Sequence, residues 1–138
     1  MTPVSHNNSL RFAGYAALFD IADAAKDVII PGAFARTLQR SGGALPLYWQ
    51  HRPEQQIGTV EHVKEDARGL RVIGQIDNPD SRAAHLLQGG NVNGLSFGYR
   101  ATQYRKTHDG RILDEIELVE VSLVTRPLQN GARVHFIS

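Results

Sequence analysis

Apolar and polar residues alternate over short stretches of the chain, a pattern that predicts strands in most of its length. The stretch at 10–19 is rich in apolar and aromatic residues, with Gly14 as a candidate bulge. Polar turns at 65–68 and 107–110 indicate that the strands beside them form hairpins. Strand-like patterns recur in six further ranges: 28–30 (a short strand or a turn), 45–49, 57–64, 69–76, 95–104 and 112–125.

Two short helices are predicted between these strands, at 31–40 and 81–88. Pro31 suits the first turn of a helix, and Phe34 and Leu38 share one face of it at i and i+4. The turn Asn78-Pro79-Asp80 is expected to supply the N-cap of the second helix. Glycine pairs end both helices, at 42–43 and 89–90.

Many short strands with two interspersed helices predict a mainly β fold with short helices (α+β). The expected architecture is a small, mostly antiparallel barrel or sandwich that the helices cover. At 138 residues the chain is long enough for one domain, over 1–138, with a core of its own. The remaining segments are expected to be irregular: a loose leader at 1–8, polar loops at 20–27 and 52–56, and a last strand or a frayed tail at 133–138.

The composition excludes several classes of function. Fifteen basic residues balance 14 acidic ones, so no strong basic field indicates a nucleic-acid or anionic-membrane partner. The chain has no cysteine, which excludes disulfides, thiolate metal sites and a cysteine nucleophile. No run reaches the ~18 apolar residues of a membrane span, and the first residues do not resemble a signal peptide. A cytoplasmic protein is therefore expected.

Neither the histidines nor the glycines form a recognisable cofactor motif. No two of the six histidines stand at the helical i, i+4 spacing or the short loop spacing that zinc sites favour, so no metal is expected. The glycines form neither a phosphate-binding loop nor a dinucleotide fingerprint. No cofactor is expected on this basis.

The stretch Asn93-Gly94-Leu95-Ser96-Phe97-Gly98-Tyr99-Arg100 places a serine between two glycines in a short apolar run. Glycines let the backbone turn tightly or let another group approach closely, which suits a serine presented near the start of a strand. A serine hydroxyl is a poor nucleophile at neutral pH. A catalytic Ser96 therefore requires a base within hydrogen-bond reach and a third group that orients this base. Taken alone, Ser96 also fits an ordinary turn serine.

His51 is the first candidate for the base. It follows the apolar stretch 45–49 and precedes a proline-containing loop, so it is expected to stand at the end of a strand. A surface histidine or a hydrogen-bonded core histidine also fits this position. His62, in the predicted strand 57–64, is the alternative base, whereas His85 is expected on an exposed helix face.

Glu120 is the candidate for the orienting group. Alternation places it on the face of Leu118, Ser122 and Val124, and because both faces of this strand are apolar, the strand is expected to be central in its sheet. A buried carboxylate is costly without a partner, and the Nδ1–H of a histidine is one such partner. An edge-strand glutamate that reaches solvent or an arginine is the alternative.

Five motifs follow one another along the chain: Gly14-Tyr15-Ala16 with Pro31-Gly32-Ala33-Phe34, Trp49-Gln50-His51, Ile57-Gly58, Gly94-Leu95-Ser96-Phe97-Gly98-Tyr99, and Leu118-Val119-Glu120-Val121-Ser122-Leu123-Val124 with Pro127 and Ala132. Taken together, they resemble the motifs of the prohead (capsid-maturation) serine proteases of tailed bacteriophages, a family distantly related in fold to herpesvirus assemblin. The chain is short for this family and also resembles the compact proteases of bacterial gene transfer agents.

The resemblance implies an assemblin-type antiparallel β-barrel flanked by helices, and the activity of a serine endopeptidase. The implied substrates are scaffold polypeptide, the N-terminal scaffolding segment of the major capsid protein, and the protease itself. The implied location is the immature capsid, or prohead, in the cytoplasm of a bacterial host. The herpesvirus relatives resemble dimer-activated enzymes, which leaves a homodimer or a higher oligomer open for this chain.

The resemblance also implies roles for individual residues. Carried over by position, Ser96 is the nucleophile and His51 the general base. Glu120 falls where the third, histidine-orienting member is expected, although the herpesvirus relatives use a histidine there. Three groups are candidates for binding the oxyanion of acyl transfer: the backbone N–H groups near Phe97 and Gly98, and Arg126.

Two functions of other kinds also fit these residues. A non-catalytic β-barrel that binds capsid or scaffold protein and assists assembly would keep its function after Ser96→Ala or His51→Ala, whereas a peptidase would not. An esterase with the same serine–histidine pair is the second alternative. An esterase of the α/β-hydrolase fold is disfavoured. In that fold a sharp strand-to-helix turn carries the serine, whereas here the strand is expected to continue after Ser96.

Overall fold

The computed structural model describes residues 9–41 and 44–138 of the chain. The leader expected at 1–8 and the glycine pair at 42–43 lie outside the described residues. Strands dominate the described part, which confirms the mainly β fold expected from the sequence. In chain order the elements are β1 (Leu10–Leu18), β2 (Asp27–Ile29), α1 (Ala35–Ser41), β3 (Leu45–Trp49), β4 (Arg52–Glu65), β5 (Gly69–Ile76), α2 (Arg82–Gln88), β6 (Gly94–Lys106), β7 (Arg111–Val124) and β8 (Val134–Ile137).

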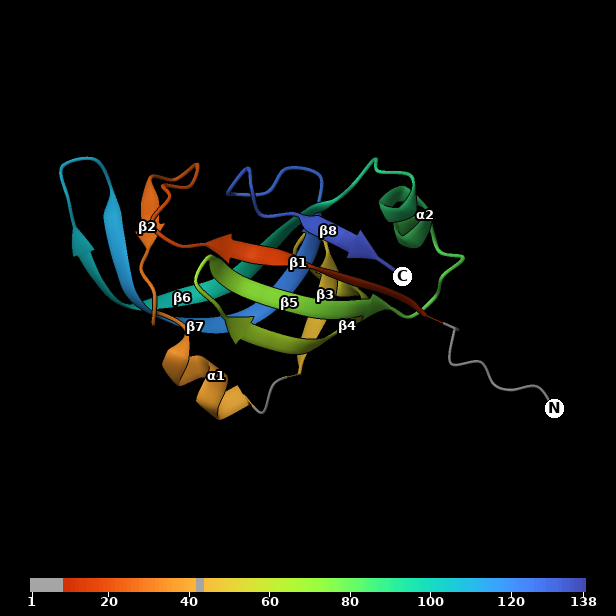
Figure 1. The fold of residues 1–138 in the computed structure, drawn as a ribbon, viewed down its shortest axis with the longest axis horizontal. Helices are drawn as coiled ribbons and strands as arrows, with labels where there is room; N and C mark the ends of the chain where they lie inside the picture. Colours follow the sequence, from red (N-terminus) through yellow and green to blue (C-terminus); the bar gives the residue numbers. More distant parts are fainter. Residues whose placement is uncertain (1–8, 42–43) are drawn as a thin grey trace.

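The strands form one curled sheet in the order β2–β7–β3–β4–β5–β1–β8, with β6 paired to the other edge of β7 (Figure 1). Most neighbours run antiparallel, whereas β2 and β3 run parallel to β7. The curl brings the two ends of the sheet together, where Gly94 bridges to Arg133 and the Leu95 N–H donates to the Ala132 carbonyl at 2.8 Å. The result is the barrel-like, mostly antiparallel sheet that the sequence predicted.

The two helices lie on opposite sides of the curled sheet in Figure 1, with α1 below it and α2 at the upper right. The first helix begins at Ala35, not at Pro31 as predicted. The segment before it is a turn, because Gly32 has a left-handed φ of 93° and the Glu65 carboxylate accepts the N–H groups of Gly32 and Phe34 at 2.8 and 2.7 Å. In the described part of the chain, no helix is long and apolar enough to cross a membrane.

The second helix is capped one residue later than expected. Ser81 is the N-cap residue, and its hydroxyl accepts the Ala84 N–H at 3.2 Å. Asn78 instead closes the preceding turn, where its side-chain oxygen accepts the Asp80 N–H at 2.9 Å. The turn Asn78-Pro79-Asp80 therefore leads into the helix without capping it.

The polar segment 52–56 is strand, not the loop predicted for it. Trp49 pairs with Arg52, and Tyr48 pairs with Gln56, so the segment continues the β3–β4 hairpin with three residues bulged out between the two pairs. Its side chains are exposed on both faces. The hydrophobic alternation by which a strand is recognised in a sequence is therefore missing here.

The last residues also form a strand. Val134–Ile137 is β8, which pairs antiparallel with β1, so the alternative of a frayed tail is wrong. The register of β1 against β8 shifts between Ala13 and Gly14, as expected for a bulge at this glycine. A Cβ atom on Gly14 would lie 2.4 Å from the Arg133 carbonyl oxygen, so only glycine lets the two strands approach this closely.

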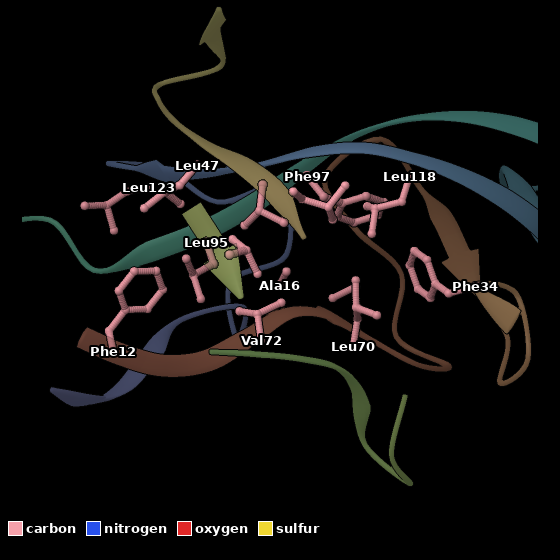
Figure 2. Close-up of a cluster of buried hydrophobic side chains, with 14 of the residues drawn as sticks. Phe12, Ala16, Phe34, Leu47, Leu70, Val72, Leu95, Phe97, Leu118 and Leu123 are labelled. Atoms are coloured by element: carbon pink, nitrogen blue, oxygen red, sulfur yellow. The ribbon is translucent and has the colours of Figure 1, made fainter. Parts of the chain in front are cut away.

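The core fills the inside of the curled sheet. Figure 2 shows Phe12, Leu70 and Val72 on one side, facing Leu47, Leu123 and Phe97 on the other, with Leu95 between them. All are buried. At the end near α1, Phe34 packs edge-on against Phe97, with ring centroids 5.5 Å apart. This core fixes the inner faces of β6 and β7, so the outward side chains of these two strands are held in place as well.

A buried ion pair joins β2 to β7. Asp27 is 4% exposed and accepts Nε–H and Nη2–H of Arg111 at 3.0 and 2.8 Å. We expect Asp27→Asn to lower the free energy of unfolding by about 1–3 kcal/mol. Breaking a fully buried ion pair costs about 3–5 kcal/mol of stability. The expected loss is smaller here because Arg111 keeps one third of its side chain in solvent. Urea denaturation measures the change.

The control is Asp114→Asn on β7. Asp114 also forms two hydrogen bonds with an arginine, Arg105, but at the surface, where such a pair contributes little to stability. Equal losses in the two variants would show that burial of Asp27 adds nothing.

Candidate active site

The pairing of β6 with β7 gathers three polar side chains on one face of the sheet. Ser96 stands directly opposite Ser122, and Gly98 stands opposite Glu120. Directly paired residues point to the same face of a sheet, and so do residues two apart on one strand. Ser96, Ser122 and Glu120 therefore share a face, which we call the site face. All three are buried, with exposed fractions of 5%, 0% and 6%.

The site face differs from simple alternation at one position. Leu118 lies in the core with Val121 and Leu123, so the expectation that it shares a face with Glu120 is wrong. The cause is a bulge: Gly98 pairs with Glu120 but Tyr99 pairs with Leu118, which leaves Val119 unpaired and 48% exposed. The strand is central as expected, since β6 pairs along one edge and β2 and β3 along the other.

His51 lies in a two-residue turn that joins β3 to β4. Gln50 and His51 have φ values of 52° and 61°, and the flanking residues Trp49 and Arg52 pair with each other. Left-handed backbone at both positions matches the tight hairpin turns for which asparagine and glycine are normally preferred. For any residue other than these, the left-handed conformation costs roughly 1–2 kcal/mol of conformational free energy. The surrounding structure must therefore hold this turn in place.

Hydrogen bonds to the end of β7 hold it. The Gln50 N–H donates to the Leu123 carbonyl at 3.0 Å, and the His51 N–H donates to Ser122 Oγ at 3.1 Å. The Gln50 side chain also binds Thr125, accepting its N–H at 3.2 Å and donating to its hydroxyl at 3.4 Å. The turn is thus fixed to the strand that carries Glu120.

The imidazole of His51 reaches Glu120 from this turn. His51 Nδ1 lies 2.8 Å from Glu120 Oε2, and the Ser122 hydroxyl donates to the other carboxylate oxygen, Oε1, at 2.8 Å. Ser122 Oγ also accepts the backbone N–H of His51, so three hydrogen bonds close a ring through these residues. Both carboxylate oxygens are bonded although the side chain is buried. Glu120 is therefore not the solvent-facing edge glutamate that was the alternative.

The hydrogen bond to Glu120 is the largest influence on His51 and raises the pKa of the imidazole above its usual 6.5. Partial burial acts in the opposite direction and is outweighed. The carboxylate thus stabilises the imidazolium form, as required of a base that must hold a proton during a reaction.

Gly98 makes room for this carboxylate. A Cβ atom on Gly98 would lie 2.5 Å from Glu120 Oε2, the oxygen that binds His51, and 2.9 Å from Cδ. Every other residue at this position would push the carboxylate away from the imidazole. The second glycine around Ser96 therefore serves the Glu120 side chain and not the serine.

Ser96 completes the cluster by its place on the strand. Among the described residues, no hydrogen bond joins its hydroxyl to His51. Catalytic hydrogen bonds are often long or misaligned without substrate and tighten when it binds, so this geometry is compatible with a nucleophile.

The oxyanion candidates differ in their surroundings. The Leu95 N–H points away from β7 toward Ala132, and since N–H directions alternate along a strand, the Phe97 N–H also points away from β7. The Gly98 N–H points toward β7 and belongs to its ladder. Arg126 is exposed and, within the described part of the chain, forms no hydrogen bond or ion pair. Of the two backbone candidates, only the Phe97 N–H is therefore left unused by the β7 ladder.

Sequence reasoning missed three residues of the site: Gln50, Ser122 and Thr125. The sequence correctly placed Ser122 on the same face as Glu120. Only the pairing of β6 with β7 shows that Ser122 also lies opposite Ser96. Gln50 and Thr125 gave no signal, because they come together only through the left-handed turn at 50–51. Glutamine and histidine do not favour this conformation. The other base candidate, His62, is exposed on β4, and His85 is exposed on α2.

A serine and a histidine–carboxylate pair are the residue types found in serine-protease sites. The model of the caudovirus prohead serine protease family matches residues 2–138, and the chain belongs to this family. Over 130 residues it is 34% identical to the prohead protease of Enterobacteria phage HK97. That match covers 89% of this chain and 58% of the phage protein, so the chain spans less than two thirds of this relative.

Solved structures show the same fold. The varicella-zoster virus protease superposes with a TM-score of 0.63 at 18% identity, covering 92% of this chain and 63% of the viral one. The capsid assembly protease gp21 of bacteriophage T4 gives 0.63 at 15% identity, covering 85% and 82%. The assemblin-type fold expected from the sequence is confirmed by the herpesvirus structures.

Proposed function

We propose that this chain is a serine endopeptidase of capsid maturation that works inside the immature capsid in the cytoplasm of a bacterial host. Its proposed substrates are scaffold polypeptide, the N-terminal scaffolding segment of the major capsid protein, and the protease itself. The observation that carries the proposal is the contact of 2.8 Å between His51 Nδ1 and Glu120 Oε2, on the face of the sheet that also carries Ser96. Membership of the prohead protease family supports the choice of substrates.

The proposed chemistry is acyl transfer. Because Nδ1 of His51 is held by Glu120, Nε2 is free to take the proton of Ser96 as its hydroxyl attacks the scissile carbonyl. The imidazolium then returns this proton to the leaving amine, and water completes the second half-reaction in the same way. Glu120 fixes the tautomer and stabilises the transient positive charge. The Phe97 N–H supplies a donor for the oxyanion.

Co-expression with the neighbouring capsid or scaffold protein tests the proposal. Intact-mass measurement should show a truncated partner with the wild-type chain and a full-length partner with Ser96→Ala. A full-length partner in both, with capsid assembly still dependent on the chain, would favour a non-catalytic assembly module instead.

The pH dependence of activity should follow His51. Because its pKa is raised above 6.5 by Glu120, we expect the acid limb of kcat/KM to have an apparent pKa above 6.5. The stabilising effect of the pair has the opposite sense: it is fully present below pH 6.5 and is lost as pH rises through the raised pKa. The pH profile of kcat/KM and NMR titration of the imidazole measure the pKa, and unfolding at several pH values measures the stability. An acid limb at or below 6.5 would contradict the role of the pair.

Ser122→Ala should reduce kcat by about 10–100-fold, because hydrogen bonds to charged groups contribute about 1.5–3 kcal/mol. The variant removes the donor to Glu120 Oε1 and the acceptor of the His51 N–H. Since Ser122 acts through its neighbours, KM should change little, and the pKa of His51 should fall toward 6.5 as its contact with Glu120 loosens.

Thr37→Val is the matched control. The Thr37 hydroxyl of α1 is also buried and accepts a backbone N–H of β7, that of Leu118 at 3.0 Å, but away from Glu120 and His51. It should cost stability without moving the His51 pKa. If both variants change kcat and the His51 pKa alike, Ser122 is only a packing residue.

A further inference from the structure

A basic pocket lies outside the site face, on the outer surface where β1, β5 and β8 adjoin. Its volume is about 250 Å³. The residues that line it come from distant parts of the chain: Tyr15, Arg68, Arg71, Gly131, Arg133 and His135. Three guanidinium groups and an imidazole therefore surround one hollow, in a chain whose net charge is only +1.

Arg133 is held rigidly by neutral groups. Its guanidinium donates to the Asn130 carbonyl at 2.7 Å, to Asn130 Oδ1 at 3.1 Å and to Asn93 Oδ1 at 2.7 Å. None of these acceptors carries a charge, so the positive charge is positioned but not neutralised. A pre-positioned arginine loses little freedom when an anion binds.

Arg68 and Arg71 contribute the other two guanidinium groups of the pocket. Arg68 lies over the ring of Tyr15, with Cζ 4.9 Å from the centroid, and Arg71 stands opposite Tyr15 in the β1–β5 ladder. In the ranges 9–41 and 44–138 neither forms an ion pair. The carboxylate of Asp66 accepts the Tyr15 hydroxyl and the N–H groups of Arg68 and Gly69, and its negative charge also interacts with Arg71. Three guanidinium groups beside this one carboxylate leave the pocket with an excess of positive charge.

An apolar groove adjoins the basic pocket and shares His135 with it. Between α2 and β8 it is lined in part by Leu87, Val134, Phe136 and Ile137. Phe136 is 60% exposed and Ile137 36% exposed, among the largest exposures of apolar side chains in the described residues. Adjacent exposed apolar groups beside a charged hollow are typical of a surface that receives a protein segment.

We propose that the basic pocket and the apolar groove together bind an acidic stretch of polypeptide. Its carboxylates lie against Arg68, Arg71 and Arg133, and a neighbouring apolar side chain covers Phe136. Charge-assisted hydrogen bonds between guanidinium and carboxylate provide the specificity. A nucleic acid fits less well, because its phosphates follow an extended basic stripe, whereas this positive patch is compact and ends in apolar side chains.

The pocket is linked to the catalytic strand. Arg133 donates to Asn93, three residues before Ser96, and bridges to Gly94 at the start of β6. A segment bound here is tethered next to the strand that carries the nucleophile. The identification of this segment as part of the polypeptide substrate rests on the proposed function, whereas the existence of the binding site does not.

Fluorescence anisotropy with the Ser96→Ala chain tests the proposal, since cleavage cannot then interfere. The probe is a short fluorescein-labelled peptide in which glutamate pairs alternate with leucines. Two comparison probes of equal length are the same peptide with glutamine for glutamate, and a single-stranded oligonucleotide. We expect the acidic peptide to bind best, with an affinity that falls as salt is raised.

The double variant Arg68→Gln, Arg71→Gln should weaken binding about tenfold or more, and Phe136→Ser should weaken it several-fold. The matched control is Arg52→Gln, Arg82→Gln, which removes two exposed arginines from a different pocket and should leave binding within about twofold. The proposal is overturned if the glutamine peptide binds equally well, if the Arg68 and Arg71 variant binds like the control, or if the oligonucleotide binds more tightly. Any of these results leaves the test of proteolysis untouched.

Discussion

Glu120→Gln should lower kcat/KM by about 10³–10⁴-fold while the fold is retained. Glutamine has the shape of glutamate, but its amide no longer carries the charge that stabilises the imidazolium. An amide N–H facing His51 Nδ1 also favours the wrong tautomer, the effect that costs about 10⁴-fold in the analogous aspartate-to-asparagine change of a serine protease. Steady-state cleavage of a peptide substrate measures the loss, and the pKa of His51 should fall with it.

The matched control is Glu117→Gln on the same strand. Glu117 is a surface residue that pairs with Arg100 at 3.7 Å, and its charge should matter by less than about twofold. A loss below about tenfold for Glu120→Gln would show that the buried carboxylate is not part of the catalytic machinery.

Gly98→Ala should also be strongly damaging, although it adds only a methyl group. The new Cβ would lie 2.5 Å from Glu120 Oε2, so the carboxylate must move away from His51. We expect a fall in kcat of about 100-fold, the typical cost of misplacing a catalytic group by about 1 Å. Overpacking of this buried site should also cost about 1–3 kcal/mol of stability.

A control variant and a double variant test whether Gly98→Ala acts through the Glu120 carboxylate. Gly89→Ala meets only the flexible side chain of Asn91 and the edge of its own helix, and it should leave kcat unchanged. The double variant Gly98→Ala, Glu120→Gln should be about as inactive as Glu120→Gln alone, because both changes act through one carboxylate. Fully additive losses would mean that Gly98 supports activity by another route.

The sequence predicted well what alternation and turn residues determine. The strands that show hydrophobic alternation, both hairpins and the central position of the Glu120 strand were correct, because each depends on a pattern within a few neighbouring residues. Three predictions failed where distant contacts decide: the Glu65 carboxylate delays the start of α1, strand pairing makes 52–56 a strand, and the bulge at Val119 moves Leu118 into the core. The N-cap of α2 was misplaced by one residue although it is a local feature, since Ser81 accepts the N–H of Ala84 three residues on.

The candidate site shows the same division. The sequence singled out Ser96, His51 and Glu120 because serine, histidine and a buried carboxylate are recognisable by type. It did not reveal how they are held. The left-handed turn at Gln50 and His51 runs against local preference and is maintained by contacts with β7. The hydrogen bond from the His51 N–H to Ser122 Oγ forms only once β3 and β7 are paired.

Covalent labelling of the purified chain with a fluorophosphonate tests the central claim most directly, because this reagent reacts preferentially with an activated serine. Peptide mass mapping should locate the adduct on Ser96 in the wild-type chain, and no adduct should form in His51→Ala. An adduct on another residue, or none at any protein concentration, would contradict the assignment of Ser96 and His51 as nucleophile and base.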